Sequence, residues 1–137
     1  MRPPVVNQSV SVAVVDDDES IGRAFSRLLR YSGFQPVTYT SAEALLQDTR
    51  RPRFDCLILD IQLPGMSGLE LAEHLRSIRD LTPVIFVTAH DEPEVRAQAT
   101  ALPCAEYFRK TDAANLVLDA LRRAVGLPAA PSQNRIE

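Results

Sequence analysis

Cysteine, lysine and long apolar segments are scarce in this chain of 137 residues. No uninterrupted apolar stretch reaches membrane-spanning length, and residues 1–4 lack the apolar run of a signal peptide. The two cysteines, Cys56 and Cys104, have no metal-ligand spacing and stand in apolar surroundings, which indicates small buried thiols. A cytoplasmic protein without membrane contact is therefore expected.

Basic residues are not in excess: 15 lysines and arginines stand against 18 acidic residues, for a formal charge of −3. This balance argues against binding nucleic acid through bulk charge. All of the basic residues except Lys110 are arginines. Because an ammonium and a guanidinium are not interchangeable at a crowded anionic site, this single lysine points to such a site. The alternative is that one basic position drew a lysine by chance.

The composition is that of one folded domain, with 45% hydrophobic and 24% charged residues. A chain of this length folds without disulfides or a structural metal. Short apolar runs alternate with amphipathic stretches, which is typical of βαβ units around a parallel sheet. Strands are predicted at residues 10–15, 35–39, 54–59, 83–87 and 105–109.

Five helices are predicted to follow these strands. The second opens at the capping-box spacing of Thr40 and Glu43. The fourth covers residues 91–102 and is stopped by Pro103. Asp112 is expected to cap the fifth helix.

Polar side chains stand where four of the predicted strands end: the acidic run 16–18, then Asp60, Thr88 and Lys110. In an open parallel sheet, binding sites form at the carboxyl ends of the strands. The structural reading of Asp18 is a helix N-cap, since acidic residues favour a helix start. Asp60 is harder to explain this way, because a carboxylate that closes an apolar run is costly to desolvate without a positive partner.

Oxygen ligands without histidine or cysteine favour Mg²⁺, Mn²⁺ or Ca²⁺, and no EF-hand loop is present. Taken singly, Thr88 would be an ordinary strand-end threonine and Lys110 a surface lysine. Together with Mg²⁺ they suit a phosphoryl group, since cation and ammonium neutralise its oxygens and the hydroxyl donates to one. A carboxylate is the available nucleophile, so the predicted covalent chemistry is formation of an aspartyl phosphate.

Four segments resemble the motifs of the receiver domains of bacterial two-component response regulators: VAVVDDDES, DCLILDIQLPGMSGLEL, PVIFVTAH and EYFRKTD, in that order. The resemblance runs from Val10 to about Val125, and the segment around Asp60 is most similar to regulators of the nitrogen-fixation type. It implies an α/β fold: a doubly wound, flavodoxin-like, five-stranded parallel sheet of order 2-1-3-4-5 with five helices.

The resemblance implies that Asp60 accepts a phosphoryl group from a phosphohistidine of a sensor histidine kinase or phosphotransfer protein. It also implies a Mg²⁺ site made by Asp17, Asp60 and the backbone carbonyl of Gln62, with Asp16 acting through water. The chain would then be a signalling domain rather than an enzyme, because it catalyses only its own phosphorylation and dephosphorylation.

A conformational switch is implied by the same resemblance. Lys110 is expected to pair with the phosphoryl oxygens and Thr88 to swing onto one of them. Tyr107 matches the aromatic residue that turns inward when Thr88 moves, so that the surface of the fourth helix, fifth strand and fifth helix changes. A homodimer through that surface is one expected output; direct nucleic-acid binding by this domain is not.

Some residues have two possible roles, and others depart from the family pattern. Gln62 and His90 either tune dephosphorylation or are ordinary exposed loop residues. Thr111 follows the lysine where the family usually has a proline, which affects the loop into the last helix. Residues 103–104 read Pro-Cys where glycine-alanine is usual.

The predicted organisation is an N-terminal extension at residues 1–9, a receiver domain at 10–125, and a flexible tail or start of a linker at 126–137. The receiver either acts alone through protein contacts or belongs to a longer regulator with a DNA-binding output. One rival function is a haloacid-dehalogenase-like phosphatase, which needs an acid where Gln62 stands. Another is a degenerate receiver that takes no phosphate, against which the retained site residues argue.

Overall fold

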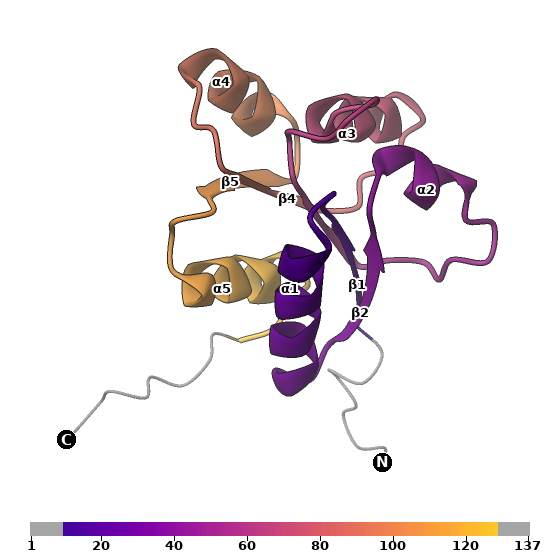
Figure 1. The fold of residues 1–137 in the computed structure, drawn as a ribbon, viewed down its shortest axis with the longest axis vertical. Helices are drawn as coiled ribbons and strands as arrows, with labels where there is room; N and C mark the ends of the chain where they lie inside the picture. The colour runs from indigo at the N-terminus through magenta and orange to yellow at the C-terminus, as the bar shows by residue number, and fades with distance from the viewer. Residues whose placement is uncertain (1–9, 129–137) are drawn as a thin grey trace.

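A five-stranded parallel sheet forms the centre of the computed structural model, which describes residues 10–128 (Figure 1). Its strands lie in the order β2-β1-β3-β4-β5. The order runs away from β1 in both directions, so β1 and β3 flank a topological switch point. The predicted doubly wound fold is confirmed by the strands β1 (Ser11–Val15), β2 (Gln35–Tyr39), β3 (Cys56–Leu59), β4 (Val84–Thr88) and β5 (Ala105–Arg109).

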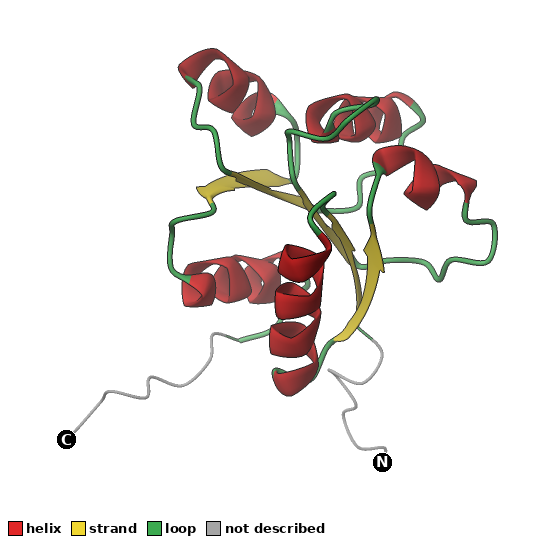
Figure 2. Cartoon of the chain, in the orientation of Figure 1, coloured by secondary structure: helices red, strands yellow, loops and turns green. Residues whose placement is uncertain are grey.

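The described residues form five helices, which cover both faces of the sheet (Figure 2). One face is covered by α1 (Glu19–Tyr31) and α5 (Ala114–Ala124). The other is covered by α2 (Ala42–Gln47), α3 (Gly68–Ser77) and α4 (Pro93–Ala101). None of these helices combines the length and apolar character that crossing a membrane requires.

Alternate residues of the central strands supply two separate cores. Ala13 and Val15 of β1 belong to the core under α2, α3 and α4, whereas Val12 and Val14 belong to the core under α1 and α5. Because successive side chains of a strand point to opposite faces, a strand covered on both sides is apolar throughout. In the three central strands, β1, β3 and β4, this arrangement leaves polar side chains only at the ends.

Two predicted helix caps are wrong. Ser41, not Thr40, caps α2, and its hydroxyl accepts from the backbone N–H of Ala44. The Glu43 carboxylate accepts the backbone N–H of Met66 at 2.8 Å, so it ties α2 to the loop before α3. This tertiary contact competes with a local capping box.

At α5 the N-cap position is Ala113, which makes no side-chain hydrogen bond. The Asp112 carboxylate accepts the backbone N–H of Arg109 instead, at 2.9 Å, and so closes the turn after β5. Asp112 thus acts one residue before the helix, on the strand side of the turn.

The end of α4 bears out the prediction that Pro103 stops this helix. The helix ends at Ala101, and Leu102 is extended, as expected for the residue before a proline. Cys104 follows with φ 58°, a left-handed conformation, and its side chain is exposed rather than buried as predicted. Cys56 in β3 is buried, as expected.

Strand boundaries differ slightly from the predictions. β3 begins at Cys56 rather than at residue 54, and β4 extends to include Thr88. Residues 1–9 and 129–137, predicted as an extension and as most of a tail or linker, lie outside the described residues.

Candidate functional site

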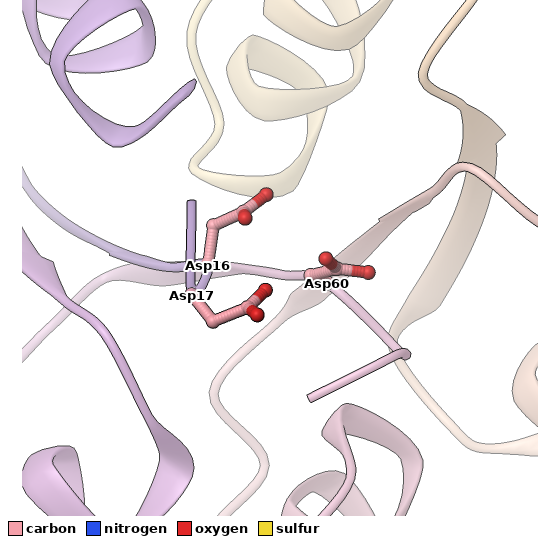
Figure 3. A group of neighbouring side chains, drawn as sticks. All are labelled: Asp16, Asp17 and Asp60. Carbon is pink, nitrogen blue, oxygen red and sulfur yellow. The ribbon is translucent and has the colours of Figure 1, made fainter. Parts of the chain in front are cut away.

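Three carboxylates gather where β1 and β3 end, at the carboxyl edge of the sheet (Figure 3). Asp16 and Asp17 follow β1, and Asp60 follows β3. One oxygen from each lies within 4.8 Å of the other two. Asp16 and Asp60 are each only 5% exposed, whereas Asp17 is open to solvent. The predicted juxtaposition of these acids is therefore present.

Lys110 brings the positive charge that these buried acids need. Its ammonium nitrogen lies 3.0 Å from Oδ2 of Asp16 and 3.0 Å from Oδ2 of Asp60. The backbone N–H of Lys110 donates to the carbonyl of Thr88 at 2.8 Å, which continues the pairing of β5 with β4 and aims the side chain at the cluster. The single lysine of the sequence thus bridges the two buried carboxylates.

Burial and charge act against each other on the pKa values of this site. Burial raises the pKa of the Asp60 carboxyl, and the hydrogen bond from Lys110 offsets this only in part. Partial burial alone would lower the pKa of Lys110, but its hydrogen bonds to Asp16 and Asp60 raise it. The ammonium therefore stays charged, while Asp60 binds a proton more readily than an ordinary aspartate does.

The backbone holds the carboxylates in place. The N–H of Gln62 donates to Oδ1 of Asp60 at 3.0 Å, and the N–H of Asp18 donates to Oδ1 of Asp16 at 2.9 Å. Asp18 also caps α1 through the N–H of Ser20, as predicted. At Gly68, a β-carbon would collide with the backbone carbonyl of Asp60. The start of α3 can approach the acidic cluster this closely only because position 68 has no side chain.

The hydroxyls of Thr88 and Tyr107 both point to the loop before α4. The Thr88 side chain is fully buried, and its hydroxyl bonds to the backbone N–H and carbonyl of His90 at 3.2 and 3.4 Å. The Tyr107 ring is buried, and its hydroxyl donates to Oδ1 of Asp91 at 3.1 Å and to the carbonyl of His90 at 3.5 Å. Both hydroxyls therefore contact the same carbonyl.

No part in the site was predicted for Arg96 or Asp91 from the sequence. The guanidinium of Arg96 lies over the Tyr107 ring, 5.2 Å from its centre, and 3.8 Å from the Asp91 carboxylate. Arg96 thus covers the ring from α4. The spacing of Arg96 and Tyr107 in the sequence contains no signal for this contact, because they belong to different elements.

The side chains of Gln62 and His90 are exposed on the loops that follow β3 and β4. This position is compatible with either of the roles left open by the sequence. The peptide bond between Lys110 and Thr111 is trans, as are all peptide bonds of the described chain.

A doubly wound sheet with clustered aspartates and a lysine at its carboxyl edge defines the receiver class of signalling domains. A family model described as the response regulator receiver domain matches residues 12–122, so this chain belongs to that family.

Relatives and solved structures agree with this assignment. The response regulator protein TodT of Pseudomonas putida is 32% identical over 122 residues, which are 89% of this chain and 53% of TodT. The chain thus spans about half the length of the curated relatives it matches. A receiver protein structure from Burkholderia phymatum shares 42% identity with a TM-score of 0.74, covering 88% of this chain and 98% of that one. The structure described as FixJ-N shares 27% identity with a TM-score of 0.77, over 90% and 99% of the two chains.

Proposed function

We propose that this domain receives a phosphoryl group on Asp60 from a phosphohistidine of a sensor histidine kinase or phosphotransfer protein. The observation that carries the proposal is the position of Asp60: a buried carboxylate, 3.0 Å from the single lysine and next to two further aspartates. Neither a structural ion pair nor a helix cap accounts for three acids gathered at one edge of the sheet.

The donor set suits Mg²⁺. Asp17 and Asp60 would bind the ion directly together with the backbone carbonyl of Gln62, and Asp16 would act through a water molecule. All the side-chain donors are carboxylate oxygens within 4.8 Å of one another, the chemistry that hard divalent cations prefer. The bound ion would neutralise the charge of the incoming phosphoryl group and of the crowded carboxylates.

The transfer is a substitution at phosphorus. A carboxylate oxygen of Asp60 forms the P–O bond while the P–N bond to the donor imidazole breaks, and the imidazole keeps that electron pair. Lys110, which already donates to Oδ2 of Asp60, is placed to shift onto a phosphoryl oxygen. An acetyl phosphate donor would react in the same way, with acetate as the leaving group.

The output is a change of the surface formed by α4, β5 and α5. When the Thr88 hydroxyl turns to the phosphoryl group, it gives up its contacts with the His90 backbone, which Tyr107 also contacts. Phosphorylation therefore favours a rearranged loop before α4 and a new setting of Tyr107 and Arg96. A homodimer, another protein, or a DNA-binding domain in a longer regulator would read this surface.

Intact-protein mass spectrometry after incubation with Mg²⁺ and acetyl phosphate tests the proposal. We expect one added phosphoryl group in the wild type and none in Asp60→Asn. Asp119→Asn on α5 is the matched control and should be labelled like the wild type. Equal labelling of Asp60→Asn would refute the assignment of the acceptor.

Two other outcomes distinguish the rival functions. Absence of an adduct, together with demonstrated Mg²⁺ binding and no response to the phosphoryl analogue BeF₃⁻, would favour a receiver that no longer takes phosphate. Multiple turnover of simple phosphate esters would favour the phosphatase, although the acid which that chemistry needs is replaced by the exposed Gln62.

A further inference from the structure

A cavity of about 720 Å³ opens at the amino ends of β3 and β4, at the edge of the sheet opposite the acidic cluster. Its walls come from the loop between α2 and β3 and from the loop between α3 and β4, which carry residues 51–55 and 78–83. The volume falls within the range of sites that hold drug-sized molecules. The receiver function proposed above uses none of these residues.

The surface of this amino-edge cavity is mostly polar, and apolar side chains form patches at its floor and at its mouth. Leu45, Phe54 and Leu75 line it and belong to the core under α2 and α3. Ile78 and Leu81, which also line it, are 59% and 57% exposed. These two side chains offer apolar surface at the mouth of the cavity.

Two arginines at the rim have no partner. Within the described part of the chain, the side chains of Arg53 and Arg79 are exposed and make no ion pair or hydrogen bond. Arg51 differs, because its guanidinium donates to the carbonyl of Leu45 at 2.9 Å and so closes the end of α2. Two guanidinium groups of the rim therefore remain available to an anion.

Within the described residues, the two acids of the cavity form no ion pair with these arginines. Oδ2 of Asp55 accepts the backbone N–H of Ser11 at 2.8 Å. Oδ1 of Asp80 accepts both the backbone N–H and the hydroxyl of Thr82, at 3.0 and 2.6 Å. The Asp55 carboxylate is thus engaged by β1, and the Asp80 carboxylate by its own loop.

The position of Arg79 in the backbone is unusual. It has φ 67°, just after the end of α3, where the N–H of Asp80 donates back to the carbonyl of Leu75. Glycine is the ordinary residue at this left-handed position, and a β-carbon there costs free energy. The chain keeps a charged side chain at the cavity rim in spite of that cost.

We infer that the amino-edge cavity binds a small amphipathic organic anion. Its anionic group, a carboxylate, phosphate or sulfonate, binds between Arg53 and Arg79. Its apolar body lies on Leu81, Ile78 and Phe54. The site is separate from the phosphoacceptor, since Cys56 at the start of β3 and Asp60 just after its end lie about 13 Å apart at the rise of an extended strand.

Binding of 8-anilinonaphthalene-1-sulfonate to the isotope-labelled full chain tests this inference by two-dimensional amide NMR. This probe is an amphipathic anion, and N-phenyl-1-naphthylamine is the same ring system without the sulfonate. We expect saturable shifts at the amides of Arg53, Phe54 and residues 79–82, with the anion binding about tenfold more tightly than the neutral analogue. Shifts confined to other residues, or equal affinity for both probes, would overturn the inference.

Variants separate the charged from the apolar contribution. Arg53→Gln with Arg79→Gln should weaken binding of the anion about tenfold and leave the neutral probe unchanged. Leu81→Ser should weaken both probes. Arg27→Gln and Leu116→Ser, which change an exposed arginine on α1 and an exposed leucine on α5, are the matched controls and should bind like the wild type.

Unchanged amide spectra away from the cavity will show that each variant is folded. Equal loss of binding in the cavity variants and in the controls would contradict a defined site. Because phosphorylation by acetyl phosphate reports separately on Asp60, failure of this binding experiment leaves the proposed receiver function standing.

Discussion

The carboxyl edge of the sheet carries acids that are buried, whereas the amino edge carries arginines that are exposed. Asp16 and Asp60 are 5% exposed and share the ammonium of Lys110, while Arg53 and Arg79 stand in solvent without a partner. A buried charge must have a partner, because desolvation is expensive. The difference indicates that the charges of the carboxyl edge are balanced within the protein. The arginines of the amino edge are left for the anionic ligand inferred above.

The two edges also differ in backbone strain. The described part of the chain has two non-glycine residues with a left-handed backbone, Arg79 and Cys104, and both lie at the amino edge of the sheet. In the loop between β3 and α3 the left-handed position is a glycine, Gly65, and the close approach to the backbone of Asp60 is made at Gly68. The backbone around Asp60 is thus built from residues that fit it, and the strain is stored at the other edge.

Among substitutions that test the difference between the two edges, Gly68→Ala should change the free energy of unfolding most. The new β-carbon would collide with the carbonyl of Asp60, so α3 or the loop after β3 must move, at a cost of about 3 kcal/mol in the free energy of unfolding. Urea denaturation measures the loss, and phosphorylation should fall with it.

Gly22→Ala in α1 is the matched control for that substitution. Its β-carbon would meet only Thr38, at an ordinary contact distance of 3.8 Å. Alanine in a helix interior should stabilise the protein by about 0.5–1 kcal/mol. Equal effects of the two substitutions would show that close packing at Asp60 is not what position 68 provides.

Lys110→Met should have the next largest effect. It leaves two buried carboxylates facing each other without a cation, which should lower the free energy of unfolding by about 2 kcal/mol in the presence of a chelator. Saturating Mg²⁺ should restore part of this loss, because the ion supplies the missing positive charge. Urea denaturation with and without Mg²⁺ gives both values.

Arg109→Met is the control for the lysine substitution. Arg109 is the exposed neighbour of Lys110, and its pairing with Asp112 lies at the surface. Its loss should change stability by less than about 0.5 kcal/mol, with no response to Mg²⁺. A similar Mg²⁺ response in both variants would place the metal outside the cluster.

Asp60→Asn should raise stability at neutral pH when Mg²⁺ is absent. Burial raises the pKa of Asp60 in the folded protein, so this group favours folding at low pH, where it is protonated. That contribution is lost as the pH rises through the raised pKa. The variant should therefore be more stable than the wild type at pH 7.

The difference in stability between Asp60→Asn and the wild type should shrink as the pH falls towards the ordinary carboxyl range, because wild-type Asp60 becomes neutral there. Denaturation curves of both proteins across this range measure this difference. A gap that widens at low pH would contradict the raised pKa.

The smallest effect is expected at the strained amino edge. Cys104→Gly relieves the left-handed backbone and should stabilise the protein by about 0.5–1 kcal/mol, measured by thermal denaturation. Cys104→Ala keeps the β-carbon and should leave stability unchanged. Equal stabilisation by both substitutions would assign the effect to the thiol rather than to the backbone.

Much of the fold was predictable from local patterns. The strands around Val12 and Val14, and around Phe86, are apolar on both faces, and such runs predict a buried parallel sheet. The caps of α2 and α5 were not predictable in this way. The Glu43 carboxylate accepts from Met66, and the Asp112 carboxylate accepts from Arg109. The position of an acidic residue near a helix start does not reveal that another backbone N–H competes for it.

The candidate site, like the fold, was predictable from the sequence only in part. Strand ends at Asp16, Asp60 and Lys110 could be recognised because parallel strands deliver their carboxyl ends to one edge. The contact of Arg96 with Tyr107 and the cavity rim at Arg53 and Arg79 could not be recognised, because their members come from separate elements.

The sequence by itself determined the order and type of the elements and which polar residues close the strands. Hydrophobic period and strand-end residues are local properties, so they can be read without coordinates. Only the tertiary structure decided that Lys110 bridges two buried acids, that Gly68 must lack a side chain, and that two arginines rim a cavity at the opposite edge. These depend on distances between segments that packing alone brings together.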